Sequence, residues 1–223
     1  MASTTAAPPL APEASEHEAL KMTYDEYLAW YDREAGRRGE WIDGEVIRFL
    51  ATGYRHERLL TFLLTMLNIV VRRRKLGVVL GSGYELRTRE GSAREPDLQV
   101  ILNEHMDRVT DRRLVGASDL VVEVISPDSV TRDRRDKLAE YAAAGIPEYW
   151  VLDPREGRTS FELFTLGEDG YYLTVQPDAE GRSCSLVLPG VWFDAAWLTA
   201  DELPDEVELG LVMAEIASDA PAL

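Results

Sequence analysis

Apolar and polar positions alternate with two periods along the chain, one typical of helices and one typical of strands. Apolar residues recur at helical spacing from His56 to Arg74, which predicts a long amphipathic helix. Leu120–Ile125 is a nearly continuous apolar run, as expected for a strand covered on both faces. A helical pattern over residues 131–144 and a short apolar run at Tyr149–Leu152 follow it. This order predicts a β-α-β unit, whose crossover makes the two strands parallel neighbours in one sheet.

Capping and turn signals place more elements around this unit. Thr23 and Glu26 have the spacing of a capping box, which predicts that a short helix begins there. Asp43-Gly44 between two apolar runs predicts a tight hairpin. A last helix is expected around residues 209–217. Five further strands, of which the first two pair as a hairpin, are expected at Val78–Leu86, Pro96–Leu102, Phe161–Leu166, Tyr171–Val175 and Ser185–Leu188. The fold class that follows is α/β, with a mixed sheet flanked by helices.

Charge is unevenly distributed along the chain. The sequence has 24 basic and 40 acidic residues and a net charge of −16, which argues against non-specific binding of nucleic acid over the whole surface. Residues 1–20 contribute −3 and residues 201–223 contribute −7, so the middle holds only −6. A local basic face is compatible with this distribution. The basic clusters of the middle part are Arg37-Arg38, Arg72–Lys75, Arg112-Arg113 and Arg132–Lys137.

Composition divides the chain and restricts its location. Residues 1–20 consist mainly of Ala, Pro, Ser, Thr and Glu, so we expect a disordered tail, followed by a domain over residues 21–200 and an acidic segment over 201–223. Cys184 is the only cysteine, which excludes an intrachain disulfide and a cysteine-based zinc site. No apolar stretch approaches the ~20 residues of a membrane span, and the start lacks the features of a secretory signal. We therefore expect a cytoplasmic protein without a membrane span.

Two carboxylates stand where the pattern predicts neighbouring strands. Asp97 begins one predicted strand, and Glu123 lies inside the apolar run of the next. A buried carboxylate needs a cation, a hydrogen-bond donor or a metal ion, because an isolated buried charge is strongly unfavourable. Lys137 lies on the helix after Glu123 and can point back over the same sheet. Two carboxylates with a lysine suit a hard divalent ion such as Mg²⁺ or Mn²⁺, which favours phosphodiester hydrolysis.

These three residues also have purely structural interpretations. Asp97 can cap a turn. Glu123 can pair with an arginine, although its place in an apolar run does not fit a solvated face. Lys137 lies four residues after Asp133, so the two can form a surface ion pair.

Two accessory candidates, Glu40 and His56, have alternatives as well. Glu40 opens the predicted hairpin and can pair with Arg38 or Arg48. His56 at a helix start can cap or pack, or its partial positive charge can meet a phosphate. His105 is expected in a loop, so the sequence does not predict a histidine metal site.

Several short motifs occur in an order and spacing that resemble one known family. They are Glu40–Glu45, His56, Glu95–Asp97, Val121–Pro127, Asp133 with Lys137, and Tyr141 followed by Gly145–Trp150 and Asp153-Pro154. Over residues 22–197 the chain is similar to the Uma-two family of endonucleases, within the PD-(D/E)xK restriction-endonuclease-like superfamily. The resemblance implies a restriction-endonuclease-like core, a divalent-metal site and often a homodimer.

The resemblance also implies a role for each matching residue. Asp97 corresponds to the metal-binding aspartate and Glu123 to the second metal ligand, with Lys137 as the lysine that stabilises developing charge. Glu40 matches an acidic residue that reaches the metal in many such nucleases. The superfamily usually has its lysine two residues after the second acidic residue, where this sequence has Ile125.

Two functions are compatible with these features. The first is a Mg²⁺- or Mn²⁺-dependent endonuclease that hydrolyses phosphodiester bonds, with DNA as the expected substrate and a homodimer as the expected assembly. The alternative is a catalytically silent nuclease-fold protein that binds nucleic acid or a protein partner, in line with the missing strand lysine and the acidic net charge. A carboxylate pair that shares one cleft with Lys137 favours hydrolysis, whereas a salt-bridged Glu123 sealed from solvent favours the silent protein.

Overall fold

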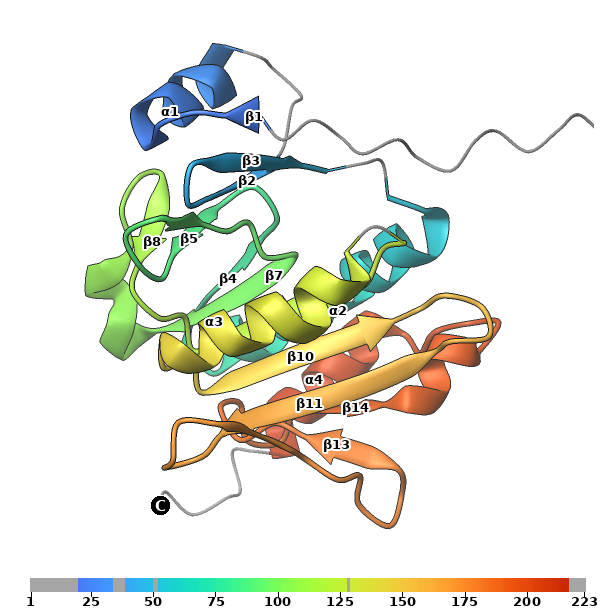
Figure 1. The fold of residues 1–223 in the computed structure, drawn as a ribbon. Coiled ribbons are helices and arrows are strands. Elements are labelled where there is room, and N and C mark those ends of the chain that lie inside the picture. Colours follow the sequence, from blue (N-terminus) through green and yellow to red (C-terminus); the bar gives the residue numbers. More distant parts are fainter. Residues whose placement is uncertain (1–19, 34–38, 50–51, 128, 217–223) are drawn as a thin grey trace, which may run out of the picture.

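A six-stranded mixed sheet forms the centre of the molecule (Figure 1). The computed structural model describes residues 20–33, 39–49, 52–127 and 129–216. In this sheet one neighbouring pair, β9 (Leu120–Val124) with β10 (Glu148–Asp153), is parallel, and the other neighbouring pairs are antiparallel. The predicted β-α-β unit and the mixed α/β fold class are confirmed. In spatial order the strands are β12 (Tyr172–Thr174), β11 (Ser160–Leu166), β10 (Glu148–Asp153), β9 (Leu120–Val124), β7 (Leu98–Leu102) and β4 (Gly77–Gly81).

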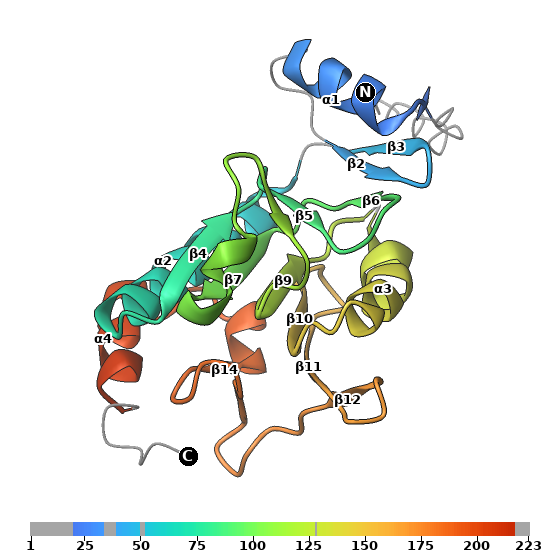
Figure 2. The same ribbon diagram turned by 90° about the vertical axis from the view of Figure 1, so that its left-hand side faces the viewer.

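Helices cover both faces of this sheet (Figures 1 and 2). One face is covered by α2 (Tyr54–Arg73) and α4 (Glu206–Ile216). The other face is covered by a π-helical turn, η2 (Arg132–Asp136), which continues as α3 (Lys137–Ala143). Gly145 follows α3 with a φ of 78°, the left-handed conformation that commonly ends a helix.

The side chains of β9 alternate between two hydrophobic cores. Val122 and Val124 belong to the larger core, which includes the buried side of α2, whereas Val121 and Ile125 belong to the core beneath α3. Residues i and i+2 of a strand share a face. Glu123 therefore lies on the face that α3 covers.

A smaller sheet with one helix stands above the central sheet in Figure 1. Its aromatic residues, Tyr27 and Trp41 among them, form a separate core between helix and sheet. The Thr23 N–H donates to Glu26 at 2.8 Å, so the predicted capping box is confirmed, and the predicted hairpin turns at Asp43. The elements are α1 (Tyr24–Arg33) and, in spatial order, β1 (Leu20–Lys21), β3 (Glu45–Arg48), β2 (Gly39–Ile42) and β6 (Ser92–Ala93).

The chain between β4 and β7 is less regular than the predicted hairpin. The two strands do pair antiparallel, but the predicted strand Val78–Leu86 is broken after Gly81. Gly83 has a φ of 96°, which takes the backbone out of the extended conformation. The chain then forms β5 (Glu85–Arg87), which pairs in parallel with β8 (Arg113–Val115).

Two other expectations need correction. Ser185–Leu188 is not a strand; it lies between β13 (Arg182–Cys184) and β14 (Trp192–Asp194). The N–H groups of Leu186 and Val187 donate to the buried Glu148 carboxylate at 2.7 and 3.1 Å, in place of a strand partner. Leu20, the last residue of the predicted tail, is part of β1, while residues 1–19 lie outside the described residues.

The acidic C-terminal part is integrated into the domain as far as residue 216. Helix α4 packs on α2 and buries Met213 and Ala214 in the larger core. Gly210 allows this close approach, because a Cβ atom there would lie 3.0 Å from the Cβ of Ile69. Residues 217–223 lie outside the described residues. In the part of the chain that the structure describes, no helix is long and apolar enough to cross a membrane.

Candidate functional site

Asp97 and Glu123 lie at one end of two neighbouring interior strands, β7 and β9. Leu98 is opposite Val122 in the antiparallel pair of β7 and β9, and the same register continued by one residue places Asp97 opposite Glu123. The Val124 N–H donates to Asp97 Oδ2 at 2.8 Å. Both carboxylates line one cavity of about 60 Å³. The expected placement on neighbouring strands is therefore confirmed.

Lys137 reaches the same cavity from the first turn of α3. Its Nζ lies 2.8 Å from Glu123 Oε1 and 3.3 Å from Asp133 Oδ1. The ion pair with Asp133 thus forms, but it is buried, since Lys137 is only 2% exposed. The Tyr141 O–H donates to the same Glu123 oxygen at 3.1 Å. Pairing with Asp133 and contact with the cavity are therefore compatible.

Glu40 contacts Lys137 from outside the cavity. Its carboxylate is fully buried, and it is not among the residues that line the cavity. One oxygen is 3.1 Å from Lys137 Nζ, and the other accepts a hydrogen bond from Arg94 at 3.0 Å. Arg48 is not among its partners, and Arg38 lies outside the described residues. Glu40 is thus placed to orient the lysine rather than to reach into the cavity.

Burial and neighbouring carboxylates both change the pKa of Glu123. Burial raises the pKa of Glu123 well above its usual value, and Asp133, Asp97 and Glu40 raise it further. Lys137 opposes this effect without cancelling it. Glu123 therefore resists ionisation more than an ordinary glutamate, as expected for a group in a low-dielectric site with several like charges.

The lysine and Glu40 are both held in their charged forms. Burial would lower the pKa of Lys137, but Glu123, Glu40 and a third carboxylate raise it well above its usual value. Burial would raise the pKa of Glu40, but Lys137, Arg94 and Arg132 lower it. The site accordingly contains a charged ammonium that is fixed on several sides by carboxylates.

His56 enters the cavity from the first turns of α2. Its side chain is buried, and its Nε2 lies 3.4 Å from Asp97 Oδ2. Burial would lower the pKa of His56, but Asp97 raises it above its usual value. His56 therefore lies beside a cavity carboxylate and restrains the orientation of Asp97.

One cavity at the end of β7 and β9 thus combines the predicted acidic pair, the helix lysine and a histidine. A family model with the description "Putative restriction endonuclease" matches residues 24–199 of this chain. The chain belongs to the Uma2 family. The matched region includes every residue of the cavity, so the resemblance expected from the motifs is confirmed.

One solved structure supports the same fold for this Uma2 chain. It is described as a putative nuclease belonging to DUF820 from Anabaena variabilis ATCC 29413. The two chains are 18% identical, with a TM-score of 0.63, and the match covers 79% of this chain and 97% of that chain. The predicted nuclease-type core is therefore confirmed at the level of the fold. A search of curated proteins finds no match to this chain.

The buried position of Ile125 accounts for one departure of this Uma2 chain from the superfamily pattern, which has a lysine two residues after the second acidic residue. It is 1% exposed and belongs to the core beneath α3, so an aliphatic side chain fills the position of the usual lysine. Lys137 instead brings an ammonium to Glu123 from the adjacent helix. A charge at one place in space can be supplied from either element.

Sequence reasoning missed the arginines of the site. Arg94 bridges Glu40 and Glu140, with its nitrogens 3.0 and 2.6 Å from the two carboxylates. Arg132 lines the cavity, and its Nε lies 3.8 Å from Glu40. The available signals were weak: Arg94 is next to the Glu95–Asp97 motif, and Arg132 begins a basic run on the following helix.

A second group of possible metal ligands lies away from this cavity, beside η1 (Asn103–Arg108). Ligand atoms of Glu104, His105 and Asp119 lie within 4.8 Å of one another. Asp119 is already satisfied by protein groups, because it accepts from the Leu102 N–H at 2.7 Å and contacts His105 Nδ1 at 2.7 Å. His105 lies in a 3₁₀ turn rather than the expected loop. This trio provides a comparison site for metal-binding experiments.

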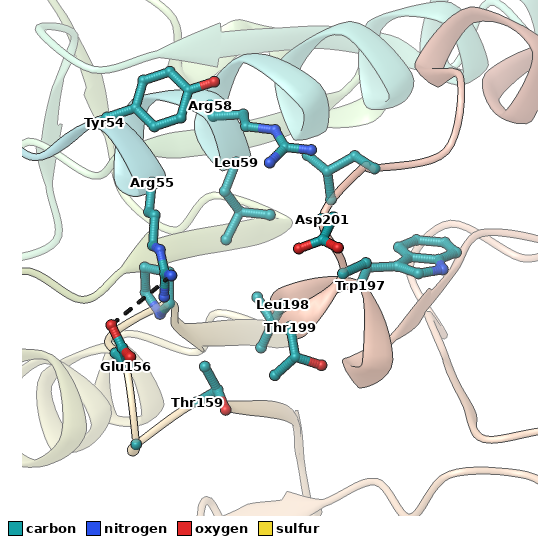
Figure 3. A pocket seen from close by; sticks show the side chains of 14 residues that line it. Tyr54, Arg55, Arg58, Leu59, Glu156, Thr159, Trp197, Leu198, Thr199 and Asp201 are labelled. Carbon is teal, nitrogen blue, oxygen red and sulfur yellow. Dashed lines mark ion pairs between the residues drawn. The ribbon is translucent and has the colours of Figure 1, made fainter.

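A larger pocket of about 360 Å³ opens beside the start of α2 (Figure 3). Arg55 and Arg58 both line it, and Arg55 lies 4.0 Å from Glu156 across it. Trp197 in its wall packs edge-on against Phe62 of the core. The pocket has no lining residue in common with the carboxylate cavity, so it is a separate feature of this surface.

The raised pKa of Glu123 predicts a pH dependence of stability in metal-free protein. Because the folded-state pKa is above the ordinary value of 4.5, this group's contribution is fully present below pH 4.5 and is lost as pH rises through the raised pKa. Glu123→Gln cannot titrate, so the variant should lose less stability over that rise. Urea denaturation in EDTA at successive pH values measures this. Parallel curves for the wild type and the variant would contradict the expectation, and Glu104→Gln serves as an exposed control.

Proposed function

We propose that this Uma2 chain is an endonuclease that hydrolyses phosphodiester bonds, with DNA as its substrate and Mg²⁺ or Mn²⁺ as its metal ion. The observation that carries the proposal is the cavity that Asp97, Glu123 and Lys137 share. Both carboxylates line this cavity, in which Glu123 is buried and the Asp97 side chain is 20% exposed. Family membership and the nuclease-type fold support the same chemistry.

The residues present fit a divalent metal ion. Asp97 and Glu123 offer carboxylate oxygens, the ligands that Mg²⁺ and Mn²⁺ prefer. Burial raises the pKa of Glu123 most, and the carboxylates of Asp133, Asp97 and Glu40 raise it further. A divalent ion bound beside Glu123 would favour its ionised form. Such an ion supplies a water molecule of lowered pKa and neutralises charge on the phosphate.

The chain's own residues have distinct tasks in this proposal. Asp97 and Glu123 would hold the metal, and the Val124 N–H and His56 keep Asp97 in place. Lys137 presents its ammonium to the phosphate oxygens, where negative charge increases in the transition state. Glu40 acts from behind as a positioning residue for Lys137.

An incubation with a panel of nucleic acids tests the function. Purified wild-type protein is mixed with Mg²⁺ or Mn²⁺ and with labelled duplex, single-stranded and branched DNA and with RNA. We expect metal-dependent internal cleavage of at least one DNA substrate, suppressed by EDTA. Lack of cleavage of the whole panel by folded, metal-loaded protein would contradict the proposal.

The silent alternative is favoured by one specific observation. Glu123 is only 3% exposed and is salt-bridged to Lys137, so catalysis requires the lysine to share this carboxylate with a metal ion. A silent protein would bind DNA with the same affinity with and without Mg²⁺ and would leave it intact. The endonuclease should cleave it and should bind the metal at the cavity.

We further propose that the nuclease acts as a homodimer, because a two-fold protein matches the approximate two-fold symmetry of duplex DNA. Light scattering at micromolar concentration should return twice the 25.0 kDa mass of one chain. A monomer mass would contradict this part of the proposal and leave the catalytic part unchanged.

A further inference from the structure

A groove of about 590 Å³ runs between the β2–β3 hairpin and the η2–α3 helix. Four arginines line it, against two acidic residues, Asp136 and Glu140. The groove is therefore locally basic in a chain whose net charge is −16. The arginines are Arg89, Arg94, Arg132 and Arg135.

Arg132 connects this groove to the carboxylate cavity, because it lines both. It is the residue that the two linings have in common. Its side chain is 15% exposed, and its buried Nε lacks a hydrogen-bond partner among the described residues. Its nearest carboxylate, Glu40, lies 3.8 Å away and is already held by Arg94 and Lys137 at closer distances. Arg132 is therefore the cation at this site whose charge and donors are least used by the protein.

Arg135 lies on the same π-helical turn, three residues further along. It is exposed, and within the described part of the chain it has no ion pair. Arg132 and Arg135 both line the groove, so one π-helical turn presents two cations to it. Arg89 across the groove is less available, because it pairs with Asp43 through two hydrogen bonds of 2.8 Å.

We propose that Arg132 and Arg135 bind the phosphates that flank the cleaved bond, so that the groove under the β2–β3 hairpin carries the substrate strand away from the carboxylate cavity. This inference rests on the proposed endonuclease function and adds the path of the strand to it. A guanidinium binds phosphate oxygens through paired donors and stays charged at every relevant pH. The π-helical turn places both arginines on the helix that also presents Lys137.

The pocket at the start of α2 offers a different path for the strand. Arg58 lines it without an ion pair among the described residues, whereas Arg55 pairs with Glu156. That pocket has no residue in common with the cavity, while the groove has Arg132. Continuity with the carboxylates thus favours the groove over the pocket of Figure 3.

Binding of DNA as a function of salt tests the path. Anisotropy of a fluorescein-labelled 20-base-pair duplex is measured with Mg²⁺ over a range of NaCl concentrations, in a Glu123→Gln background that is expected to bind without cleaving. Arg132→Gln and Arg135→Gln should each make the slope of log K against log salt shallower by about 1, and the double variant by about 2. Arg73→Gln is the matched control, because Arg73 is exposed at the other end of α2, about 25 Å of helix from His56.

The outcomes separate the path from the function. Unchanged slopes for Arg132→Gln and Arg135→Gln, or equal changes in Arg73→Gln, would overturn the groove. A change in Arg58→Gln without one in Arg135→Gln would assign the strand to the pocket of Figure 3 and also overturn it. Arg135→Glu, a change at an exposed position, should weaken binding further than Arg135→Gln and covers the case in which Arg132→Gln does not fold. Cleavage by the wild type is measured separately, so failure of the endonuclease function is recognised independently.

Discussion

Replacing Lys137 with methionine is expected to lower the free energy of unfolding of the metal-free protein by about 3–5 kcal/mol at neutral pH. Methionine keeps most of the stem and removes the ammonium. Glu123, Asp133 and Glu40 would then lose the cation that lies within 3.3 Å of each of them. An uncompensated buried charge is among the most destabilising changes a single substitution can make. Urea denaturation in EDTA measures the loss.

A charge-balanced double variant controls this prediction. Glu40→Gln removes one of the carboxylates that Lys137 serves, so Glu40→Gln/Lys137→Met should recover part of the stability lost in Lys137→Met. Mild destabilisation by Lys137→Met, of about 0.5 kcal/mol or less, would contradict the prediction and show that the buried ion pairs of Lys137 contribute little net stability.

The same substitution is expected to slow cleavage. Loss of one preorganised electrostatic donor typically lowers the rate by ~10²-fold or more, and metal binding through Asp97 and Glu123 should survive. Rates are compared in the double variant if the single variant is too unstable. Undiminished cleavage by folded protein would remove Lys137 from the catalytic group and leave it as a structural cation.

Mg²⁺ or Mn²⁺ is expected to stabilise the wild-type protein strongly and to stabilise Asp97→Asn and Glu123→Gln much less. A ligand that binds only the folded state adds about 2.7 kcal/mol at a concentration of 100 times its Kd. Both substitutions remove a carboxylate that lines the cavity. The shift in Tm with metal concentration is the measurement.

His105→Ala is the matched control for the metal experiment. It disrupts the other group of possible ligands in the described residues, Glu104, His105 and Asp119. The variant should keep the full metal-induced shift in Tm. Loss of the shift in His105→Ala, with a normal shift in Asp97→Asn, would move the metal from the carboxylate cavity to that trio.

Most of the central sheet could be predicted from the sequence because its signals are local. The apolar run at Leu120–Ile125 and the strand that follows one helix later leave little choice of topology. The prediction of one strand over Val78–Leu86 was wrong because the sequence pattern does not show that Gly83 adopts a positive φ, which ends the extended conformation there. The prediction of a strand at Ser185–Leu188 was wrong because the backbone N–H groups there donate to Glu148, a residue distant in sequence, instead of to a neighbouring strand.

The candidate site was only partly predictable. Asp97 and Glu123 could be assigned to adjacent strands from the pattern, and Lys137 to the helix that covers Glu123. The burial of Glu40 behind Lys137 could not be inferred, because the β2–β3 hairpin reaches the site only through the tertiary fold. The contact of Arg132 with the cavity could not be predicted, because the sequence does not show which basic residues of Arg132–Lys137 face the cavity.

The measurement that tests the central claim most directly is the rate of Mg²⁺-dependent cleavage of a DNA substrate by the wild type, Asp97→Asn and His105→Ala at matched concentrations of folded protein. The carboxylate cavity as the hydrolytic site predicts that Asp97→Asn cleaves at least about 10²-fold more slowly, with His105→Ala at the wild-type rate. Wild-type cleavage by Asp97→Asn would contradict the claim.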